Sequence, residues 1–167
     1  MRIKFILLLL LLLCSCSFYN NKNSDILYLN NSNYWTNDLN EIELVMSYVM
    51  TSKDYQTMKK RDANKRLEFL NSYWLTLDPD STTIDNELLL ELNRRVLKSK
   101  ELFSGFDGGL MSDRARIYIT YGPPTNEYKS YIDNQELITW SYKTGYEFNF
   151  ISDNFGRYRI INYEFIR

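Results

Sequence analysis

The sequence contains no histidine. This absence excludes serine or cysteine catalysis with an imidazole base, zinc helices with paired histidines, and histidine-based pH switches. Cysteine is nearly absent too, because the only two, Cys14 and Cys16, lie close to the amino terminus. The rest of the chain therefore has no disulfide framework and no thiolate ligands for zinc or iron–sulfur clusters. We expect no metal and no cofactor, so few routes to chemistry remain, chiefly through carboxylates, lysine or tyrosine.

The sequence also lacks an excess of either charge, since its formal net charge is −1. Such a chain has no long-range positive field, so we expect no nucleic-acid partner. Glycine and proline are scarce, whereas tyrosine, phenylalanine and tryptophan make up 16% of the residues. The length of 167 residues suffices for one hydrophobic core, and these aromatic side chains supply much of its area.

One apolar run opens the chain and ends at Leu13-Cys14-Ser15-Cys16. Arg2 and Lys4 give it a positive start, and its leucines from position 7 to 13 suit the apolar region of a secretory signal. They are too few to cross a bilayer, which needs about 20 apolar residues. A cysteine directly after a small residue, with a leucine three positions before it, resembles the lipobox of bacterial lipoproteins.

The lipobox resemblance implies cleavage between Ser15 and Cys16 and attachment of lipid to the Cys16 sulfur. Cys14 is the weaker candidate, because the bulky Leu13 occupies the position that usually holds a small residue. An ordinary signal peptide, or an uncleaved anchor with incidental cysteines, is the alternative. Ser17 after the modified cysteine, in place of aspartate, favours the periplasmic face of the outer membrane over the inner membrane, under the sorting rule of enteric bacteria.

These signals divide the chain into three parts. Residues 1–15 are the predicted signal peptide, and residues 16–37, rich in asparagine and serine, are a lipidated tether. Residues 38–167 form one domain, with a helical part at 38–104 and a short helix followed by strands at 112–167.

The first half of this domain carries apolar residues at helical spacing. Asp38, Ser52 and Thr83 each precede an apolar stretch and can cap a helix start. Asp78-Pro79-Asp80 ends a stretch, since proline disfavours the helical conformation in the residue before it. These residues do not open a calcium loop, because Thr83 and Leu89 stand where an EF-hand needs glycine and glutamate. The predicted helices run from Asp38 to about Thr51, from Ser52 through Met58, from Asp62 to Thr76 and from Thr83 to Phe103.

Residues 112–124, which follow a glycine-rich loop, are ambiguous. Their β-branched and aromatic residues are typical of a strand. Their ends are typical of a helix, with Ser112 as the amino-terminal cap, Gly122 after the last turn and two prolines beyond it. We predict a short helix here.

Apolar residues then alternate, which predicts β-strands. Ile138, Trp140 and Tyr142 share one face, and Phe148 and Phe150 share another. The predicted fold is α+β: about four amino-terminal helices, then a short helix and a three-stranded antiparallel β-meander covered on one face by helices. The three predicted strands run from Glu136 to Lys143, from Tyr146 to Ser152 and from Arg157 to Phe165.

Two stretches of the sequence form one pattern. The first contains Phe69-Leu70, Tyr73-Trp74, Leu77-Asp78-Pro79, Thr83, Asn86-Glu87, Arg95 and Phe103, and the second contains Gly109 to Tyr118, Tyr121-Gly122-Pro123-Pro124, Trp140 and Tyr142. Together the two stretches resemble the GWxTD-domain family of bacterial envelope proteins. In the signature itself, Leu110 replaces the tryptophan, Ser112 replaces the threonine and Ala115 replaces a usual glycine. The resemblance implies the fold and the envelope compartment, and the family brings no established enzymatic activity with it.

A weaker similarity points to small lipoproteins of the outer-membrane barrel-assembly machinery. It rests on the order of a capped helix, a Gly-Pro-Pro turn, a Trp-x-Tyr strand and a meander. Those lipoproteins are accessory proteins that stabilise partners without catalysing a reaction, and fold alone does not fix function.

The residues around the signature, from Gly109 to Arg116, are expected to serve structure or interaction, and none is assigned to catalysis. Asp113 would lie at the positive end of a helix, and the two arginines after it would pair with acids such as Glu87, Glu91 or Asp107. The candidate residues are Gly109, Ser112, Asp113, Arg114, Arg116, Tyr118, Gly122, Pro123 and Pro124, with Trp140 and Tyr142 as an aromatic contact or part of the core.

The sequence therefore predicts a non-enzymatic lipoprotein that is anchored to the membrane by its amino-terminal lipid and contacts an envelope protein partner. A module that binds glycan or another envelope ligand through sheet tyrosines, Tyr142, Tyr146, Tyr158 and Tyr163, is the alternative. A carboxylate-dependent hydrolase using Asp107 and Asp113 is a third hypothesis, which requires a cleft that joins the two acids.

We predict that Cys16→Ala abolishes lipidation and leaves the chain unprocessed by lipoprotein signal peptidase. The amino-terminal cysteine of a lipoprotein carries several acyl chains, and more than one is needed for stable anchoring. Metabolic labelling with a fatty acid measures the result, with Cys14→Ala as the control that keeps the label. Label that persists in Cys16→Ala and disappears in Cys14→Ala would move the site to Cys14.

Overall fold

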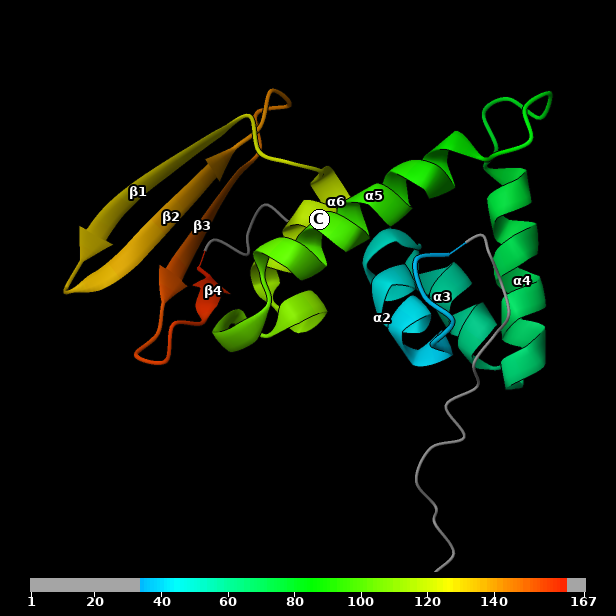
Figure 1. Ribbon diagram of the computed structural model, residues 1–167, viewed down its shortest axis with the longest axis horizontal. Helices are drawn as coiled ribbons and strands as arrows, with labels where there is room; N and C mark the ends of the chain where they lie inside the picture. Colours follow the sequence, from blue (N-terminus) through cyan, green and yellow to red (C-terminus); the bar gives the residue numbers. More distant parts are fainter. Residues whose placement is uncertain (1–33, 162–167) are drawn as a thin grey trace, which may run out of the picture.

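The computed structural model describes residues 34–161, which form a helical half and a sheet half joined by one short helix (Figure 1). Residues 1–33 lie outside this range, so the predictions on Ser15, Cys16 and most of the tether stay predictions. Residues 162–167, including Tyr163, lie outside it as well. Within the described range, no helix is long and apolar enough to cross a membrane.

Capping side chains set where the helices of the first half begin. Thr51 caps the second helix, and the prediction of Ser52 was wrong, because the Thr51 hydroxyl accepts the Asp54 N–H while Ser52 is already helical. The prediction of Thr83 was wrong as well, since its hydroxyl donates to the Asp80 carbonyl in a turn and Asn86 caps the helix instead. The helices are α2 (Leu39–Val49), α3 (Ser52–Lys59), α4 (Ala63–Thr76) and α5 (Glu87–Leu102), and Asp38 and Asp62 cap α2 and α4.

The ambiguous segment forms helix α6 (Asp113–Tyr121), which confirms the helix prediction. The Ser112 hydroxyl accepts the Ala115 N–H at 3.1 Å. Gly122 follows the last turn with φ of 83°, a left-handed value that glycine adopts at little cost. The glycine-rich loop before α6 contains two short 3₁₀ turns, η2 (Gly105–Asp107) and η3 (Gly109–Met111).

The sheet is antiparallel, but it has four strands in the order β1-β2-β3-β4, so the prediction of three strands was wrong. The missed strand is β1. Every one of its residues is exposed, and its sequence has no alternation of apolar and polar residues that would predict a strand. A turn at Asp133 and Asn134, both at positive φ, connects it to β2. The strands are β1 (Asn126–Ile132), β2 (Gln135–Ser141), β3 (Glu147–Ser152) and β4 (Tyr158–Ile160).

The two apolar rows of the sheet lie on one face rather than on separate faces. Ile138 pairs with Phe150 and Trp140 pairs with Phe148, and in an antiparallel sheet paired residues point to the same side. This face packs against α6 and Phe103, and Trp140 is 2% exposed.

Helix α6 contributes to two separate cores. Ile117 and Tyr118 pack with Trp140 in the core under the sheet, whereas Ile119 packs in the core between α2, α3, α4 and α5. Both isoleucines are buried. The helix therefore joins the two halves of the protein, as Figure 1 shows.

We predict that Trp140→Ala lowers the free energy of unfolding by about 3–5 kcal/mol, because the indole fills the sheet core against Phe103, Tyr118 and Phe150. Chemical denaturation followed by far-ultraviolet circular dichroism measures the loss. Tyr131→Ala is the control, since Tyr131 is 75% exposed on β1 and should change stability little. Near-native stability of Trp140→Ala would mean that the indole contributes a surface contact instead.

Candidate functional site

The outer edge of β4 is bonded to carboxylates rather than to another strand. Asp153 N–H donates to the Arg157 carbonyl and Ile161 N–H donates to the Asn149 carbonyl. The backbone N–H and C=O groups of the odd-numbered residues on this side of the hairpin, including Arg159 of β4, therefore point toward β3. The N–H groups of Tyr158 and Ile160 point the other way. Asp107 accepts the first at 2.9 Å, and Asp113 accepts the second at 3.0 Å.

Each of these carboxylates also binds an arginine of α6. Arg114 Nε donates to Asp107 Oδ2 at 2.9 Å, and Arg116 Nη2 donates to Asp113 Oδ1 at 3.1 Å. The side chains of Asp107 and Arg114 are 4% and 16% exposed, so this ion pair is largely shielded from water. The two negative charges are therefore compensated inside the fold.

The arginines thus pair with only one of the three acids outside α6 that the sequence suggested, Asp107. The prediction of Glu91 was wrong, because Glu91 binds Arg94 and Arg95 of its own helix. Hydrogen bonds from Arg94 and then Arg95 lower the pKa of the Glu91 carboxyl to about 2. The prediction of Glu87 was wrong too, since its carboxylate lies 2.8 Å from the Thr83 hydroxyl and forms no ion pair within residues 34–161.

Tyr158 connects the Asp107–Arg114 pair to strand β2. The Arg114 guanidinium lies 3.9 Å from the centre of the Tyr158 ring, and the Tyr158 hydroxyl donates to Glu136 of β2. Burial, with the hydrogen bond to Glu136, raises the pKa of the Tyr158 hydroxyl to about 12, and the same hydrogen bond lowers the pKa of Glu136. At neutral pH Tyr158 is a donor and does not act as a base.

The other end of α6 is held by Arg95 of α5. Its guanidinium donates to two carbonyls in the last turn of α6, those of Ile119 and Thr120, at 3.2 and 3.1 Å. A Cβ atom on Gly122 would lie 3.3 Å from this guanidinium, so glycine allows the close approach. The Tyr142 hydroxyl donates to the Gly122 carbonyl at 3.0 Å. Pro123 and Pro124 then lead the chain from α6 toward β1.

The remaining signature residues differ in burial: Gly109 is half-buried, whereas Leu110 and Tyr118 are buried. Gly109 donates its N–H to the Phe103 carbonyl at 2.8 Å. Leu110, in the place of the signature tryptophan, is buried in the helical core, and its carbonyl accepts the Tyr48 hydroxyl at 3.0 Å. Tyr118 lies between Phe103 and Trp140.

The sheet tyrosines that could bind a glycan are largely packed together. Tyr142 and Tyr146 both contact the rings of Tyr121 and Phe148. Tyr158 lies under Arg114, and Tyr146, at 40% exposure, is the most open of the three. The described sheet therefore offers no flat open aromatic face on its helix side.

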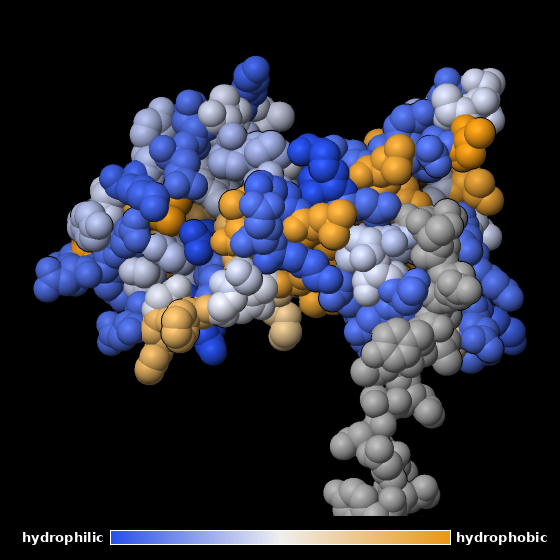
Figure 2. All heavy atoms as spheres, in the orientation of Figure 1, coloured by the Kyte–Doolittle hydropathy of each residue, from blue (hydrophilic) through white to orange (hydrophobic). Residues whose placement is uncertain are grey.

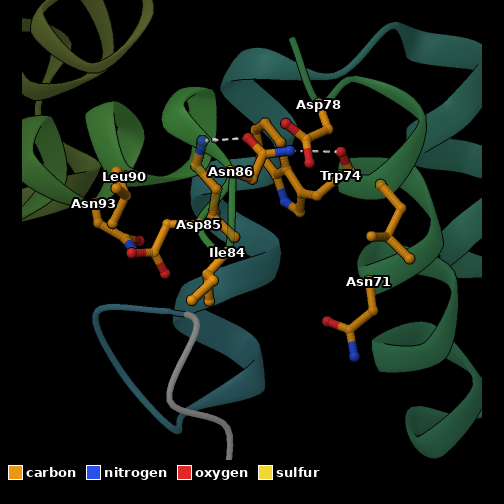
Figure 3. Close-up of a pocket in the computed structure, with 10 residues that line it drawn as sticks. Asn71, Trp74, Asp78, Ile84, Asp85, Asn86, Leu90 and Asn93 are labelled. Atoms are coloured by element: carbon orange, nitrogen blue, oxygen red, sulfur yellow. Dashed lines mark hydrogen bonds between the residues drawn. The ribbon is translucent and has the colours of Figure 1, made fainter. Parts of the chain in front are cut away.

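A hollow of about 310 Å³ lies at the far end of the helical half, between α4 and α5 (Figure 3). Asn86 connects α4 and α5 at this hollow, because its side chain accepts the Leu89 N–H and donates to the Trp74 carbonyl (Figure 3). Figure 2 shows apolar surface over this part of the molecule. We call the hollow the α4–α5 groove, and it is lined by Asn71, Trp74, Leu75, Asp78, Ile84, Asp85, Asn86, Leu89, Leu90 and Asn93.

The α4–α5 groove combines exposed apolar side chains with uncompensated acids. Leu75 is 75% exposed, Leu90 is 50% exposed and Ile84 is fully exposed. Asp78 and Asp85 also line it, and within residues 34–161 neither of them forms an ion pair. Such a surface fits a partner that is apolar at its centre and basic at its edges.

The sequence reasoning missed this groove. One signal was available: Leu88, Leu89 and Leu90 are consecutive in α5, so a helix cannot bury all three on one face. In the structure only Leu89 is buried. In the described part of the chain, no cluster of three or more acidic or sulfur ligands is placed to hold a metal ion.

Comparison with known proteins identifies a domain family. The model of the GWxTD domain matches residues 14–166. No curated protein matches the chain, and no solved structure matches it, so the similarity to lipoproteins of the barrel-assembly machinery is not supported.

We predict that Asp113→Asn lowers the free energy of unfolding by about 1–3 kcal/mol. Both carboxylate oxygens of Asp113 accept from N–H donors, of Arg116 and of Ile160. The amide group of asparagine has one oxygen, so its NH₂ group would face one of these donors and that hydrogen bond would be lost. An exposed helix end would lose only about 0.3–1 kcal/mol. Hydrogen exchange should speed up at the amides of Ile160 and Tyr158. Asp85→Asn, on an exposed side chain, is the control. Unchanged exchange at Ile160 would contradict the role of Asp113 at the β4 edge.

Proposed function

This chain belongs to the GWxTD-domain family, and on that basis we propose that it is a lipid-anchored envelope protein that acts as a non-catalytic accessory or scaffold. It is attached through Cys16 to the periplasmic face of the outer membrane and binds another envelope protein. The partner presents an apolar side chain flanked by lysine or arginine to the α4–α5 groove.

The contacts of the signature residues support a non-catalytic role. A hydrolytic carboxylate needs an open face toward substrate and water. Asp107 is 8% exposed and is engaged by Arg114 and the Tyr158 N–H. Asp113 is engaged by Arg116 and the Ile160 N–H. Both carboxylates therefore have a structural role, because their bonds hold α6 and β4 together.

The exposed apolar side chains of the α4–α5 groove are the observation that carries the proposal. Leu75, Ile84 and Leu90 surround the groove and leave apolar area in contact with water, which a docked partner would cover. Asp78 and Asp85 at its border add negative charge without an internal cation, so basic residues of the partner would be attracted. A glycan ligand is less favoured, because Tyr142 and Tyr158 already pack against internal groups.

A photo-reactive amino acid at position 84 of the full-length protein, expressed in a bacterial envelope, tests the groove. We expect a cross-link to a protein segment in which an apolar residue is flanked by Lys or Arg. Leu90→Gln should lower the cross-linking about 5- to 30-fold, the loss of 1–2 kcal/mol expected for a central contact. Leu97→Gln is the matched control, because Leu97 lies on the same helix at 54% exposure and outside the groove lining.

Charge provides the second arm of this test. Asp85→Lys should weaken the cross-link, and so should raised salt, because both reduce the attraction for a basic partner. Cross-links only to lipid or to residues 17–33 of the same chain would contradict the proposal. Equal losses with Leu90→Gln and Leu97→Gln would contradict it as well.

A further inference from the structure

Strand β1 forms the outer edge of the sheet, on the side farthest from the helices (Figure 1). All of its residues, Asn126–Ile132, are exposed, although it pairs with β2 along its whole length. An edge strand of this kind presents unpaired backbone groups that can extend a sheet into another chain.

The register identifies which backbone groups are unpaired. Tyr142 N–H donates to the Tyr146 carbonyl, so the even-numbered residues of β2 bond to β3 and the odd-numbered ones bond to β1. Thr139 of β2 lies opposite Tyr128 of β1, so the even-numbered residues of β1 face β2. The N–H and C=O groups of Glu127, Lys129 and Tyr131 therefore point outward.

The two edges of the sheet differ in this respect. At β4 the outward N–H groups are taken up by Asp107 and Asp113. Among residues 34–161, no side chain forms a hydrogen bond with the outward backbone groups of Glu127, Lys129 or Tyr131. The fold thus closes one edge and leaves the other open.

The charges on β1 are complementary to those of a second β1 in the opposite direction. Glu127 and Lys129 lie two residues apart, so their side chains are on the same face of the strand. A register of two antiparallel β1 strands is defined by the residue that lies on the two-fold axis between them. Three neighbouring registers, with Tyr128, Lys129 or Ser130 on the axis, let the outward backbone groups of the two copies form hydrogen bonds with each other. The register centred on Lys129 places two lysines opposite each other, and the one centred on Ser130 places Glu127 opposite Asp133. Only the register centred on Tyr128 pairs Glu127 with Lys129, and it does so twice.

We propose that two copies of this protein pair through β1, antiparallel, with Tyr128 on the two-fold axis and Glu127 of each copy opposite Lys129 of the other. The four-stranded sheets of the two copies become one continuous sheet. The internal contacts leave room for this pairing. Lys129 is 56% exposed and lies 3.3 Å from Glu136, and Glu127 uses one carboxylate oxygen to accept the Trp140 indole N–H at 2.8 Å.

Disulfide trapping tests the register in the full-length protein in detergent, in a Cys14→Ser background. On the axis, a non-hydrogen-bonded pair brings the two Cα atoms to about 4.5 Å, within the range that a disulfide spans. Tyr128→Cys should therefore give a disulfide-linked dimer under mild oxidation. Ser130→Cys should not, because its neighbour across the axis is Asn126. The Cys14→Ser parent shows any background from Cys16.

Charge reversal tests the pairing itself, with sedimentation of the dimer as the readout. Lys129→Glu places like charges opposite each other and should lower the dimer fraction several-fold, and Glu127→Lys/Lys129→Glu should restore it. A thermal melt of each variant shows whether the Glu127 contact with Trp140 is still in place.

Wild-type protein that stays monomeric at all concentrations would overturn the proposal. Lys129 would then be a charged residue that prevents the edge strand from pairing with another chain. Equal trapping by Tyr128→Cys and Ser130→Cys, or no rescue by the folded double variant, would overturn the proposal too. The α4–α5 groove lies at the opposite end of the molecule, so these results do not depend on its partner (Figure 1).

Discussion

The β4 edge is closed by carboxylates from outside the sheet, and the arrangement of the two halves of the protein depends on this closure. β4 has three residues and would be a weak edge by itself. Asp107 and Asp113 bind its outward N–H groups and, through Arg114 and Arg116, bind α6 as well. A carboxylate accepts from several donors at once, so one residue type can bond to a strand and to a helix together.

Helix α6 transmits this attachment to the helical half. It is short, and its stability comes from burial and from the groups at its ends rather than from its own length. Ser112 caps the amino end and Asp113 adds a negative charge to the first turn, while Arg95 and the glycine conformation at Gly122 satisfy the carboxyl end. Ile117 and Ile119 then fill different cores. The polar residues of the signature thus position α6 between the two cores.

The surfaces left open lie at the two far ends of the molecule. The α4–α5 groove exposes apolar side chains beside uncompensated acids, and the β1 edge exposes unpaired backbone beside charges of both signs. The first favours a partner of different sequence, and the second is complementary to itself. One molecule can use both surfaces together, because they do not overlap.

The sequence by itself determined those elements whose signals are local. Helical spacing and capping residues located the helices to within a few residues, and the end signals Ser112 and Gly122 outweighed the strand-like composition of α6. Alternation placed Trp140 in the core. Tertiary structure alone decided what depends on distant partners. β1 has no apolar face and is defined by its pairing with β2, and the carboxylates of Asp107 and Asp113 meet N–H groups 51 and 47 residues away. Spacing along a chain carries the periodicity of one element, but it does not record which buried donor a carboxylate will meet once the chain has folded.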